Sequence, residues 1–393
     1  MNGNAYFFHH RAAEAYKFNE EHPFDPVRLM LSIDLLKEAG ALKDEEIREP
    51  DVEASDELLA LAHRTDYIQA VKQLDNEADP RSKSVLSEQF GLQDGDDTPF
   101  FPGLHGAASS IVSGTVSAAA AVMSGKVQHA YHMAGGLHHA FPDRAAGFCV
   151  YNDAAIAIAY IRHHYKAKVL YIDTDVHHGD GVQWCFYDDP EVCTYSIHET
   201  GKFLFPGTGY VYEKGTDKGF GSCVNLPLEP YTEDDSWLEC FEGSLRKVVA
   251  SFQPDVILSQ HGCDAHAFDP LSHIHCSMNI YSRIPALIHQ LAHDHCQGRW
   301  IAVGGGGYDH WRVVPRAWSM VWLEMTDHKL AREIANHKKL RLPGGWLKRW
   351  RMRSPFPLPR YWLDEKKDIP AIPRREQITE ANRSMLAIAI QDL

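Results

Sequence analysis

Short apolar runs and longer amphipathic stretches alternate along the chain from about residue 126 onward. The apolar runs fall at residues 127–131, 168–172, 192–197, 255–259 and 300–303, and stretches with helical periodicity separate them. Short Val/Ile/Leu runs without polar alternation are typical of strands in a parallel sheet that is covered on both faces. The pattern predicts an α/β fold with a mostly parallel central sheet and helices on both faces.

Helices are also predicted before this region. Residues 25–39 have helical periodicity and end at a glycine, and residues 55–74 form a helix pair in an N-terminal cap. The small-residue run at 109–125 is too short and too polar to cross a membrane, so we expect a buried helix that closes at Gly125.

Residues 171–180 place three carboxylates and two imidazoles directly after the apolar run 168–172. Ligand sites in parallel sheets lie just beyond the carboxyl ends of the strands. Asp175 and His177 are two residues apart, so on an extended chain they point to one side and can share a metal ion. Asp173 has the same parity and is either a further ligand or an outer carboxylate that orients one.

A second apolar run, 255–259, opens into a polar, glycine-containing turn that carries Asp264. Asp264 is therefore a candidate third ligand beside Asp175 and His177. Two carboxylates and one imidazole leave a position open for water, as a catalytic zinc site requires. Oxygen-rich ligation also suits iron or manganese, so the ligands alone do not name the metal.

Two adjacent histidines, His138 and His139, follow the glycines at 135–136. Adjacent side chains on an extended segment point apart, so both serve one site only where the backbone is irregular, which glycine permits. Next to Asp173 and Asp180, the two imidazoles are interpreted as carboxylate-oriented general acid/base groups.

A third glycine turn, 304–307, follows the apolar run 300–303 and ends in Tyr308. Four glycines allow close backbone approach, so the phenol can be presented at the strand end as a hydrogen-bond donor. Strand, glycine turn and polar residue thus recur at three separated places, which favours a shared site over flexible turns.

Five segments match the motifs of one known family in that family's order. They are Gly-Gly-Leu-His-His-Ala at 135–140, Gly-Phe-Cys-Val-Tyr-Asn-Asp at 147–153, Asp-Thr-Asp-Val-His-His-Gly-Asp-Gly at 173–181, Phe-Pro-Gly-Thr-Gly at 205–209 and Gly-Gly-Gly-Gly-Tyr at 304–308. On these motifs the chain resembles the histone deacetylase superfamily over residues 5–325, and within it the bacterial acetoin-utilisation group. The resemblance implies an arginase/deacetylase-like α/β fold.

The resemblance also implies the roles of the catalytic residues. The implied zinc ligands are Asp175, His177 and Asp264. The implied acid/base groups are the tandem histidines His138 and His139, paired to Asp173 and Asp180 respectively, and the implied carbonyl-binding phenol is Tyr308. In the mechanism that follows from these roles, His139 moves the proton to the leaving amine and His138 is its electrostatic partner.

A narrow tunnel for the aliphatic stem of acetyl-lysine is implied at Gly147, Phe148 and Phe205. Asp97 aligns with a rim aspartate that holds the substrate backbone, and its neighbour Asp96 is the alternative.

A structural or regulatory potassium ion is implied near the catalytic metal. Its implied ligands are the carbonyls of Asp173, Asp175, His177 and Ile197 and the side chains of Asp173 and Ser196. One departure from eukaryotic class I relatives is Leu137, where these relatives commonly carry an aromatic residue, and this leaves open the shape of the cavity behind the metal.

Composition narrows the class of protein. The net charge of −14 over 393 residues disfavours binding to phosphate backbones and favours a basic substrate. The eight cysteines form no Cys-x-x-Cys pair, and the N-terminus lacks a basic region followed by an apolar stretch. We therefore expect a cytoplasmic protein with reduced thiols and without nucleic-acid or membrane partners, whose oligomeric state stays open.

Residues 1–325 are expected to form one catalytic domain, because motifs far apart in the sequence must meet at one site. Residues 326–393 are basic and rich in Trp and Pro. We expect this extension to pack across the domain, and docking of a partner or second subunit is the alternative.

Together these features predict zinc-dependent hydrolysis of acetyl-lysine amides in proteins, with iron as the alternative metal. The acetoin-utilisation group points to a metabolic enzyme such as an acetyl-CoA synthetase as the acetylated substrate. Three alternatives are weighed: a small-molecule deacetylase acting on acetylpolyamines, an arginase-like two-manganese hydrolase, and a non-catalytic acyl-lysine reader. The non-catalytic reader is disfavoured because every expected catalytic position is filled.

Overall fold

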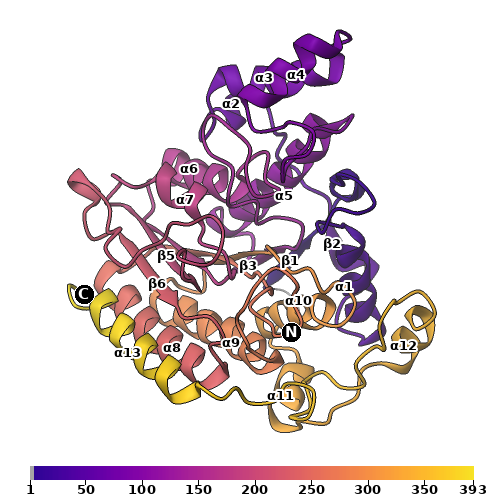
Figure 1. Ribbon diagram of the computed structural model, residues 1–393, viewed down its shortest axis with the longest axis vertical. Helices are drawn as coiled ribbons and strands as arrows, with labels where there is room; N and C mark the ends of the chain where they lie inside the picture. Colours follow the sequence, from indigo (N-terminus) through magenta and orange to yellow (C-terminus); the bar gives the residue numbers. More distant parts are fainter. Residues whose placement is uncertain (1–3) are drawn as a thin grey trace.

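One continuous parallel sheet forms the centre of the computed structural model, which describes residues 4–393 (Figure 1). Its strands are β1 (Ala5–Phe8), β2 (Ile47–Arg48), β3 (His129–His132), β4 (Val169–Asp173), β5 (Val192–Glu199), β6 (Cys223–Leu228), β7 (Val256–Gln260) and β8 (Trp300–Val303). Their order in the sheet is β2-β1-β3-β8-β7-β4-β5-β6, and all neighbouring pairs are parallel. Every residue of β3 through β8 is buried, including the polar residues of β5, as expected of a parallel sheet that is covered on both faces.

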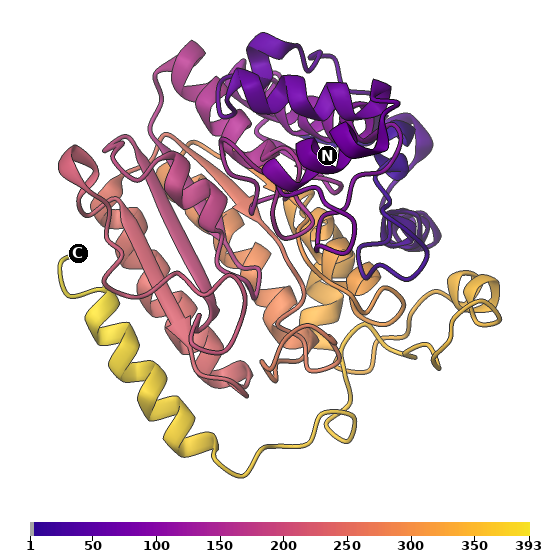
Figure 2. The ribbon, with the colours of Figure 1, turned by 45° about the horizontal axis from the view of Figure 1, so that its top comes forward.

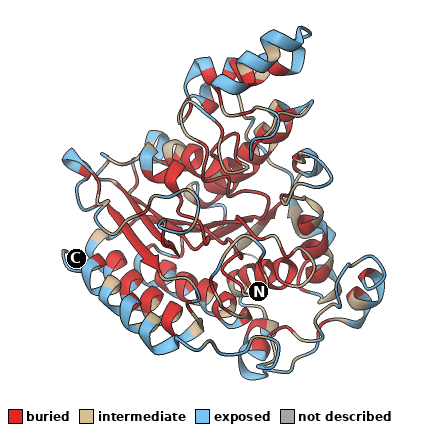
Figure 3. Ribbon diagram, viewed as in Figure 1, coloured by how far each residue is buried: buried red, intermediate tan, exposed pale blue. Residues whose placement is uncertain are grey.

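Helices cover both faces of the sheet. They are α1 (Val27–Glu38), α2 (Asp56–Leu59), α3 (Thr65–Asn76), α4 (Pro80–Gln89), α5 (Leu104–Met123), α6 (Asp153–Tyr165), α7 (Asp180–Cys185), α8 (Asp234–Phe252), α9 (Met278–His295), α10 (Val314–Met325), α11 (Lys329–Asn336), α12 (Gly344–Trp350) and α13 (Arg375–Ala389). One layer contains α5, α6 and α7, and the other contains α1, α10, α9 and α8 with α13 outside α8 (Figures 1 and 2). The burial colours in Figure 3 show that each layer turns its buried side toward the sheet.

The predicted fold class is confirmed, and the five predicted strands correspond to β3, β4, β5, β7 and β8. The predicted helices at 25–39 and 55–74 correspond to α1 and to the pair α2 and α3. Strands β1, β2 and β6 were not predicted.

Helix α5 begins five residues earlier than predicted, at Leu104, and is long and apolar enough by composition to cross a membrane. The prediction that this segment is too short and too polar was therefore wrong. The most apolar stretch of α5 is 67% buried inside the protein, where the helix packs on α6 and β3. Helix α5 is therefore described better as a core helix.

The C-terminal extension packs along the main body at two places. Near its start, Trp346 is fully buried and its indole Nε1–H donates to the carbonyl of Leu31 in α1 at 3.0 Å. Near its end, α13 lies against α8 and β6, and the amide of buried Asn382 donates to Thr232 Oγ1 and Ser236 Oγ.

Asp364 links this extension to the loop that follows β7. It forms an ion pair with buried Arg316 at 2.9 Å, and it accepts hydrogen bonds from His266 Nε2 at 2.9 Å and from the backbone N–H of Met278 at 2.8 Å. Burial raises the pKa of Asp364, but the charges of Arg316 and His266 outweigh burial and lower it well below its ordinary value. Because His266 lies two residues after Asp264, the extension supports a predicted metal ligand.

Replacing Asp364 with alanine should strongly destabilise the fold, because Arg316 would be left as an uncompensated buried charge. We expect a loss of about 3–5 kcal/mol in the free energy of unfolding, measured by urea denaturation. The matched control is Glu365→Ala, because within residues 4–393 the Glu365 carboxylate forms ion pairs with the largely exposed Lys339 and Lys367 alone, so its loss should change stability little. Equal midpoints for the two variants would contradict the support proposed for Asp364.

Candidate active site

The site lies where the strand order of the sheet reverses. Strand β4 has β5 on one side and β7 on the other, and Asp173 at its end is in register with Ser196 and Gln260 on these neighbours. Open parallel sheets bind ligands outside the carboxyl ends of strands at such a switch point. The turns after β4 and β7 carry Asp175, His177 and Asp264.

Three potential metal ligands converge there. His177 Nδ1 lies 3.1 Å from Asp175 Oδ1 and 3.1 Å from Asp264 Oδ2, and all three side chains are buried. A tetrahedral metal with ligand bonds near 2.0–2.2 Å separates its ligand atoms by roughly 3.3 Å, so the spacing fits one ion. Burial and the charge of Asp175 raise the pKa of Asp264 to about 6. A divalent cation would relieve this repulsion, so the residues fit the metal that the sequence predicts.

Glycine at position 306 keeps the space around these carboxylates open. The backbone N–H of Gly306 donates to Asp175 Oδ2 at 2.6 Å. A Cβ at this position would lie 2.1 Å from Asp264 Oδ2 and 2.7 Å from Asp175 Oδ2. Gly306 of the predicted glycine turn therefore packs directly against the candidate ligands Asp175 and Asp264.

Both tandem histidines are held by the carboxylates expected from the sequence. Nδ1 of His138 lies 2.8 Å from Asp173 Oδ2, Nδ1 of His139 lies 2.7 Å from Asp180 Oδ1, and the two ring centroids are 3.9 Å apart. Burial lowers the pKa of His138, but the charges of Asp173 and Asp175 outweigh burial and raise it to about 9. At His139, burial and the charge of His138 lower the pKa to about 4. The pair therefore offers one imidazolium and one neutral imidazole near neutral pH.

Asn152 and Asp153 hold the histidine segment in place, a role that the sequence did not indicate. The side-chain amide of Asn152 donates to the carbonyls of His138 and Ala140, and its oxygen caps α6. Both oxygens of buried Asp153 accept from backbone N–H groups of the segment, including that of Leu137 at 2.7 Å. Their position at the start of a helix within the matching motif was the available signal.

Tyr308 leaves the glycine turn beside the metal ligands. Its ring packs edge-on against Phe148 at 5.8 Å, and its backbone N–H donates to Asp269 Oδ2 at 2.7 Å. Burial and the nearby carboxylates of Asp264 and Asp175 raise the pKa of Tyr308 well above its ordinary value. The phenol therefore keeps its proton and can donate a hydrogen bond to a carbonyl oxygen.

Arg28 in α1 fixes the same turn and was missed from the sequence. Its guanidinium is buried, donates to the carbonyls of Gly305 at 2.9 Å and Gly307 at 3.2 Å, and stacks over Phe24 and Trp318. A cation within the apolar helix segment 27–36 was the signal that could have identified it.

The predicted tunnel residues surround the approach to this centre. Phe205 is 45% exposed and packs edge-on against His139 at 5.0 Å, while Phe148 packs against Tyr308 on its own side. Gly147 lies directly against the ring of His139, since a Cβ there would be 2.4 Å from its Cδ2. Two aromatic rings and a glycine thus lie next to His139 and Tyr308, and the tunnel itself stays a prediction.

Of the two rim candidates, Asp97 is the one tied to the tunnel. Its Oδ2 accepts from the backbone N–H of Gly147 at 3.1 Å, and its Oδ1 accepts from Thr98 Oγ1 at 2.8 Å. Thr98 in turn accepts from the N–H of Phe148. Asp96 is exposed, and among the described residues no side-chain partner is found for it. The geometry favours Asp97 as the rim residue.

The predicted potassium ligands lie on β4, β5 and the turn after β4. Asp173 and Ser196 are register partners on adjacent strands, and Ile197 is buried next to Ser196. Ser196 Oγ lies 2.8 Å from His198 Nδ1. The potassium site stays a prediction.

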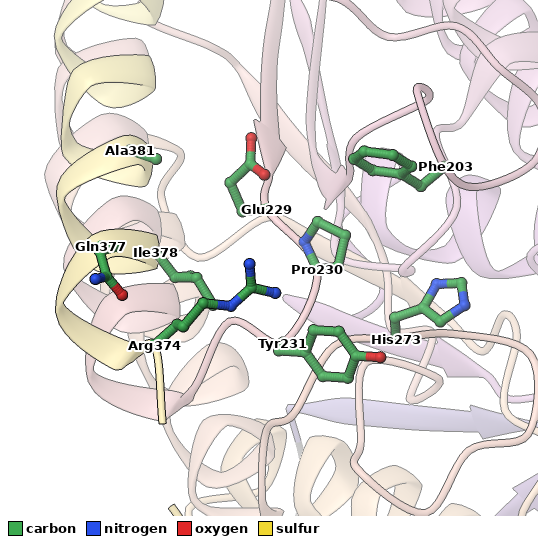
Figure 4. A pocket seen from close by; sticks show the side chains of 9 residues that line it. All are labelled: Phe203, Glu229, Pro230, Tyr231, His273, Arg374, Gln377, Ile378 and Ala381. Carbon is green, nitrogen blue, oxygen red and sulfur yellow. The ribbon is translucent and has the colours of Figure 1, made fainter. Parts of the chain in front are cut away.

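A separate cavity of about 470 Å³ lies between α13 and the loops at the carboxyl end of β6 (Figure 4). It shares two loops with the candidate active site, because residues 200–209 contribute Phe203 here and Phe205 to the tunnel, and the loop after Asp264 contributes His273. Arg374 extends from the start of α13 toward Pro230 and Tyr231, and no described residue forms an ion pair with its guanidinium.

Residues 22–325 match the family described as the histone deacetylase domain. The chain is 50% identical to the acetoin utilization protein AcuC of Bacillus subtilis (strain 168), covering 98% of this chain and 96% of that protein. It is 46% identical to AcuC of Staphylococcus xylosus, with 93% and 92% covered.

Solved structures give the same picture. The chain superposes on the crystal structure of an HDAC homologue from Aquifex aeolicus with a TM-score of 0.81 and 25% identity, covering 98% of this chain and 100% of that one. It superposes equally widely on an HDAC homologue complexed with SAHA, with a TM-score of 0.80 and 26% identity.

Gly306→Ala should weaken metal binding without unfolding the protein, because the added methyl group would overlap two ligand carboxylates and displace them. We expect affinity for Zn²⁺ to fall by about tenfold or more, measured by competition with a chelator. Gly106→Ala in α5 is the control, since a Cβ there meets nothing within 4 Å. Unchanged affinity in Gly306→Ala would count against Asp175 and Asp264 as joint ligands.

Proposed function

The chain belongs to the histone deacetylase family, and on that premise we propose that it is a metal-dependent deacetylase that hydrolyses acetyl-lysine amides in proteins. The products are acetate and a free lysine side chain. The observation that carries the proposal is the convergence of Asp175, His177 and Asp264 beside a histidine pair whose imidazoles are held by carboxylates.

We propose zinc as the metal, with iron as the alternative. Asp175, His177 and Asp264 would hold it and leave a position open for the reacting groups. When bound, the metal supplies Lewis acidity at the acetyl carbonyl and makes a water molecule more acidic. The potassium ion predicted from the sequence belongs to the same proposal and would bind backbone carbonyls around Asp173.

The protein's own groups then divide the work of amide hydrolysis. Tyr308 donates a hydrogen bond to the oxygen on which charge develops, and a preorganised donor of this kind contributes about 3–4 kcal/mol. Neutral His139, with Nδ1 held by Asp180, takes the proton from the attacking water at its other nitrogen and passes it to the leaving amine. His138, charged and held by Asp173, stabilises the negative charge of the transition state.

The tunnel suits the tetramethylene stem of lysine. Phe148 and Phe205 offer apolar faces, and each buried methylene contributes about 0.8 kcal/mol. Gly147 leaves room at the base, and Asp97 at the rim can accept hydrogen bonds from the substrate backbone. Because the Asp97 carboxylate can accept from backbone N–H groups of the substrate, it favours an acetyl-lysine within a polypeptide over a free acetylated amine.

The physiological substrate is proposed from the names of the relatives. Two of them are acetoin utilization proteins, so we propose a role linked to acetoin utilisation, with an acetyl-CoA synthetase as a candidate acetylated substrate. All eight cysteines are free thiols, in keeping with the cytoplasmic location that we propose.

The alternatives are weakened by particular contacts. In an arginase-like two-metal site, further carboxylates would bridge a second ion, whereas here Asp173 and Asp180 are each hydrogen-bonded to a tandem histidine. An acetylpolyamine deacetylase would use the same centre, and substrate comparison separates it.

The first test is turnover of an acetyl-lysine peptide and of acetylputrescine by zinc-reconstituted protein and by Asp264→Ala. We expect peptide turnover that disappears in Asp264→Ala, because that variant lacks a metal ligand. Turnover of acetylputrescine alone would favour the small-molecule reaction. No turnover of either substrate would contradict acetyl-lysine hydrolysis and favour another acyl group or the non-catalytic reader.

The second test addresses the acid/base assignment. His139→Ala should lower kcat by about 10²–10⁴, and Tyr308→Phe by about 10²–10³, while the zinc content stays that of the wild type. Near-wild-type kcat in His139→Ala would refute its role as the proton shuttle.

The third test addresses the cavity beside α13. We propose that it receives substrate residues that flank the acetyl-lysine, with an apolar side chain against Phe203 and Ile378 and an acidic one at the unpaired Arg374. Arg374→Glu should raise KM several-fold for peptides with an acidic flank and leave a single acetyl-lysine amide unaffected. The control is Arg351→Glu at the exposed residue directly after α12, which makes the same change of charge elsewhere. Equal effects of the two variants would argue against the cavity as a docking site.

A further inference from the structure

Three histidines gather at the opposite end of the sheet from the candidate active site. His129 is the first residue of β3, where it is in register with Trp300, the first residue of β8. His289 and His293 lie one helical turn apart near the end of α9. The catalytic candidates follow the carboxyl ends of the strands, so this cluster at the amino end is a distinct place in the fold.

The imidazole nitrogens of this cluster converge on one point. His289 Nε2 lies 3.1 Å from His129 Nε2 and 3.0 Å from His293 Nε2, and the possible ligand atoms of all three residues lie within 4.8 Å of one another. The rings meet at steep angles, 83° for His129 with His289 and 64° for His289 with His293. Zinc bonds of about 2.0–2.1 Å in tetrahedral geometry place two nitrogens roughly 3.3 Å apart, close to both distances.

Hydrogen bonds among the three imidazoles do not explain the cluster. A neutral imidazole has one N–H and one in-plane lone pair, so Nε2 of His289 can donate or accept only one well-aligned hydrogen bond. Two other Nε2 atoms nevertheless lie within 3.1 Å of it. At least one of these two Nε2–Nε2 contacts therefore lacks a well-aligned hydrogen bond. A cation bound between the nitrogens would explain why they lie so close together.

The surroundings keep lone pairs available. His129 and His289 are buried, and burial disfavours the protonated imidazolium. Neutral imidazole is the form that binds a metal. His293 is exposed, so an ion can enter from solvent and keep water in its remaining positions.

We propose that His129, His289 and His293 form a second metal site, which binds zinc or another divalent ion that prefers imidazole, such as nickel or copper. The bound ion ties the end of α9 to the start of β3 and thereby stabilises the fold, with no part in the hydrolytic reaction. The chain then holds two transition-metal ions, one at each end of the sheet, so a count of two ions would not by itself indicate a two-metal hydrolase.

Zinc stoichiometry of the full chain tests the proposal. After equilibrium dialysis against Zn²⁺, the wild type should hold two ions, and His293→Ala should hold one at full peptide turnover. The affinity of the second site should fall at least about 10- to 100-fold in His293→Ala, since even removal of an outer partner of a ligand costs that much. His295→Ala, an exposed histidine two residues away in α9, is the matched control and should retain both ions.

A complementary measurement isolates this site from the catalytic one. In Asp264→Ala, added Zn²⁺ should still raise the melting temperature, and Asp264→Ala combined with His289→Gln should abolish that rise. One ion in the wild type, or a second ion that survives both His293→Ala and His289→Gln, would overturn the proposal.

Discussion

Mutual repulsion between buried carboxylates is the constraint on which the site depends. Asp175 and Asp264 both lie within 3.1 Å of one imidazole nitrogen, in surroundings from which water is almost excluded. Such an arrangement costs free energy unless a cation compensates it. The surrounding structure holds it together through backbone donors, namely the N–H of Gly306 to Asp175 and that of Val176 to Asp264.

The fold meets this constraint by placing two chain segments side by side that are far apart in sequence. Strands β4 and β7 are neighbours at the switch point, so their following turns face each other. Arg28 of α1 holds the glycine turn after β8 through the carbonyl of Gly305. Asp364 supports the turn after β7 through His266. The C-terminal extension is in this way part of the scaffold of the site, and α13 adds one wall of the cavity beside it.

The sequence predicted the central strands and the motif residues because both leave local patterns. Strand β6 escaped because Asn225 and Pro227 interrupt its apolar run, which an edge strand tolerates, and β2 is only two residues long. The predicted ligands and histidine–carboxylate pairs do meet in space, although their catalytic roles stay predictions. Arg28 and Asp364 were missed because their partners, Gly305 and His266, lie 277 and 98 residues away. A cation in an apolar helix marks Arg28 as unusual, but no local pattern identifies either partner.

Anomalous diffraction at the zinc edge, from crystals of the zinc-loaded protein, would test the central claim most directly. We expect a peak bonded to His177 Nδ1 and to one carboxylate oxygen each of Asp175 and Asp264, with Tyr308 and His139 facing its open side. A zinc-loaded crystal with no peak at this position, or with a pair of bridged ions there, would contradict the one-metal deacetylase centre.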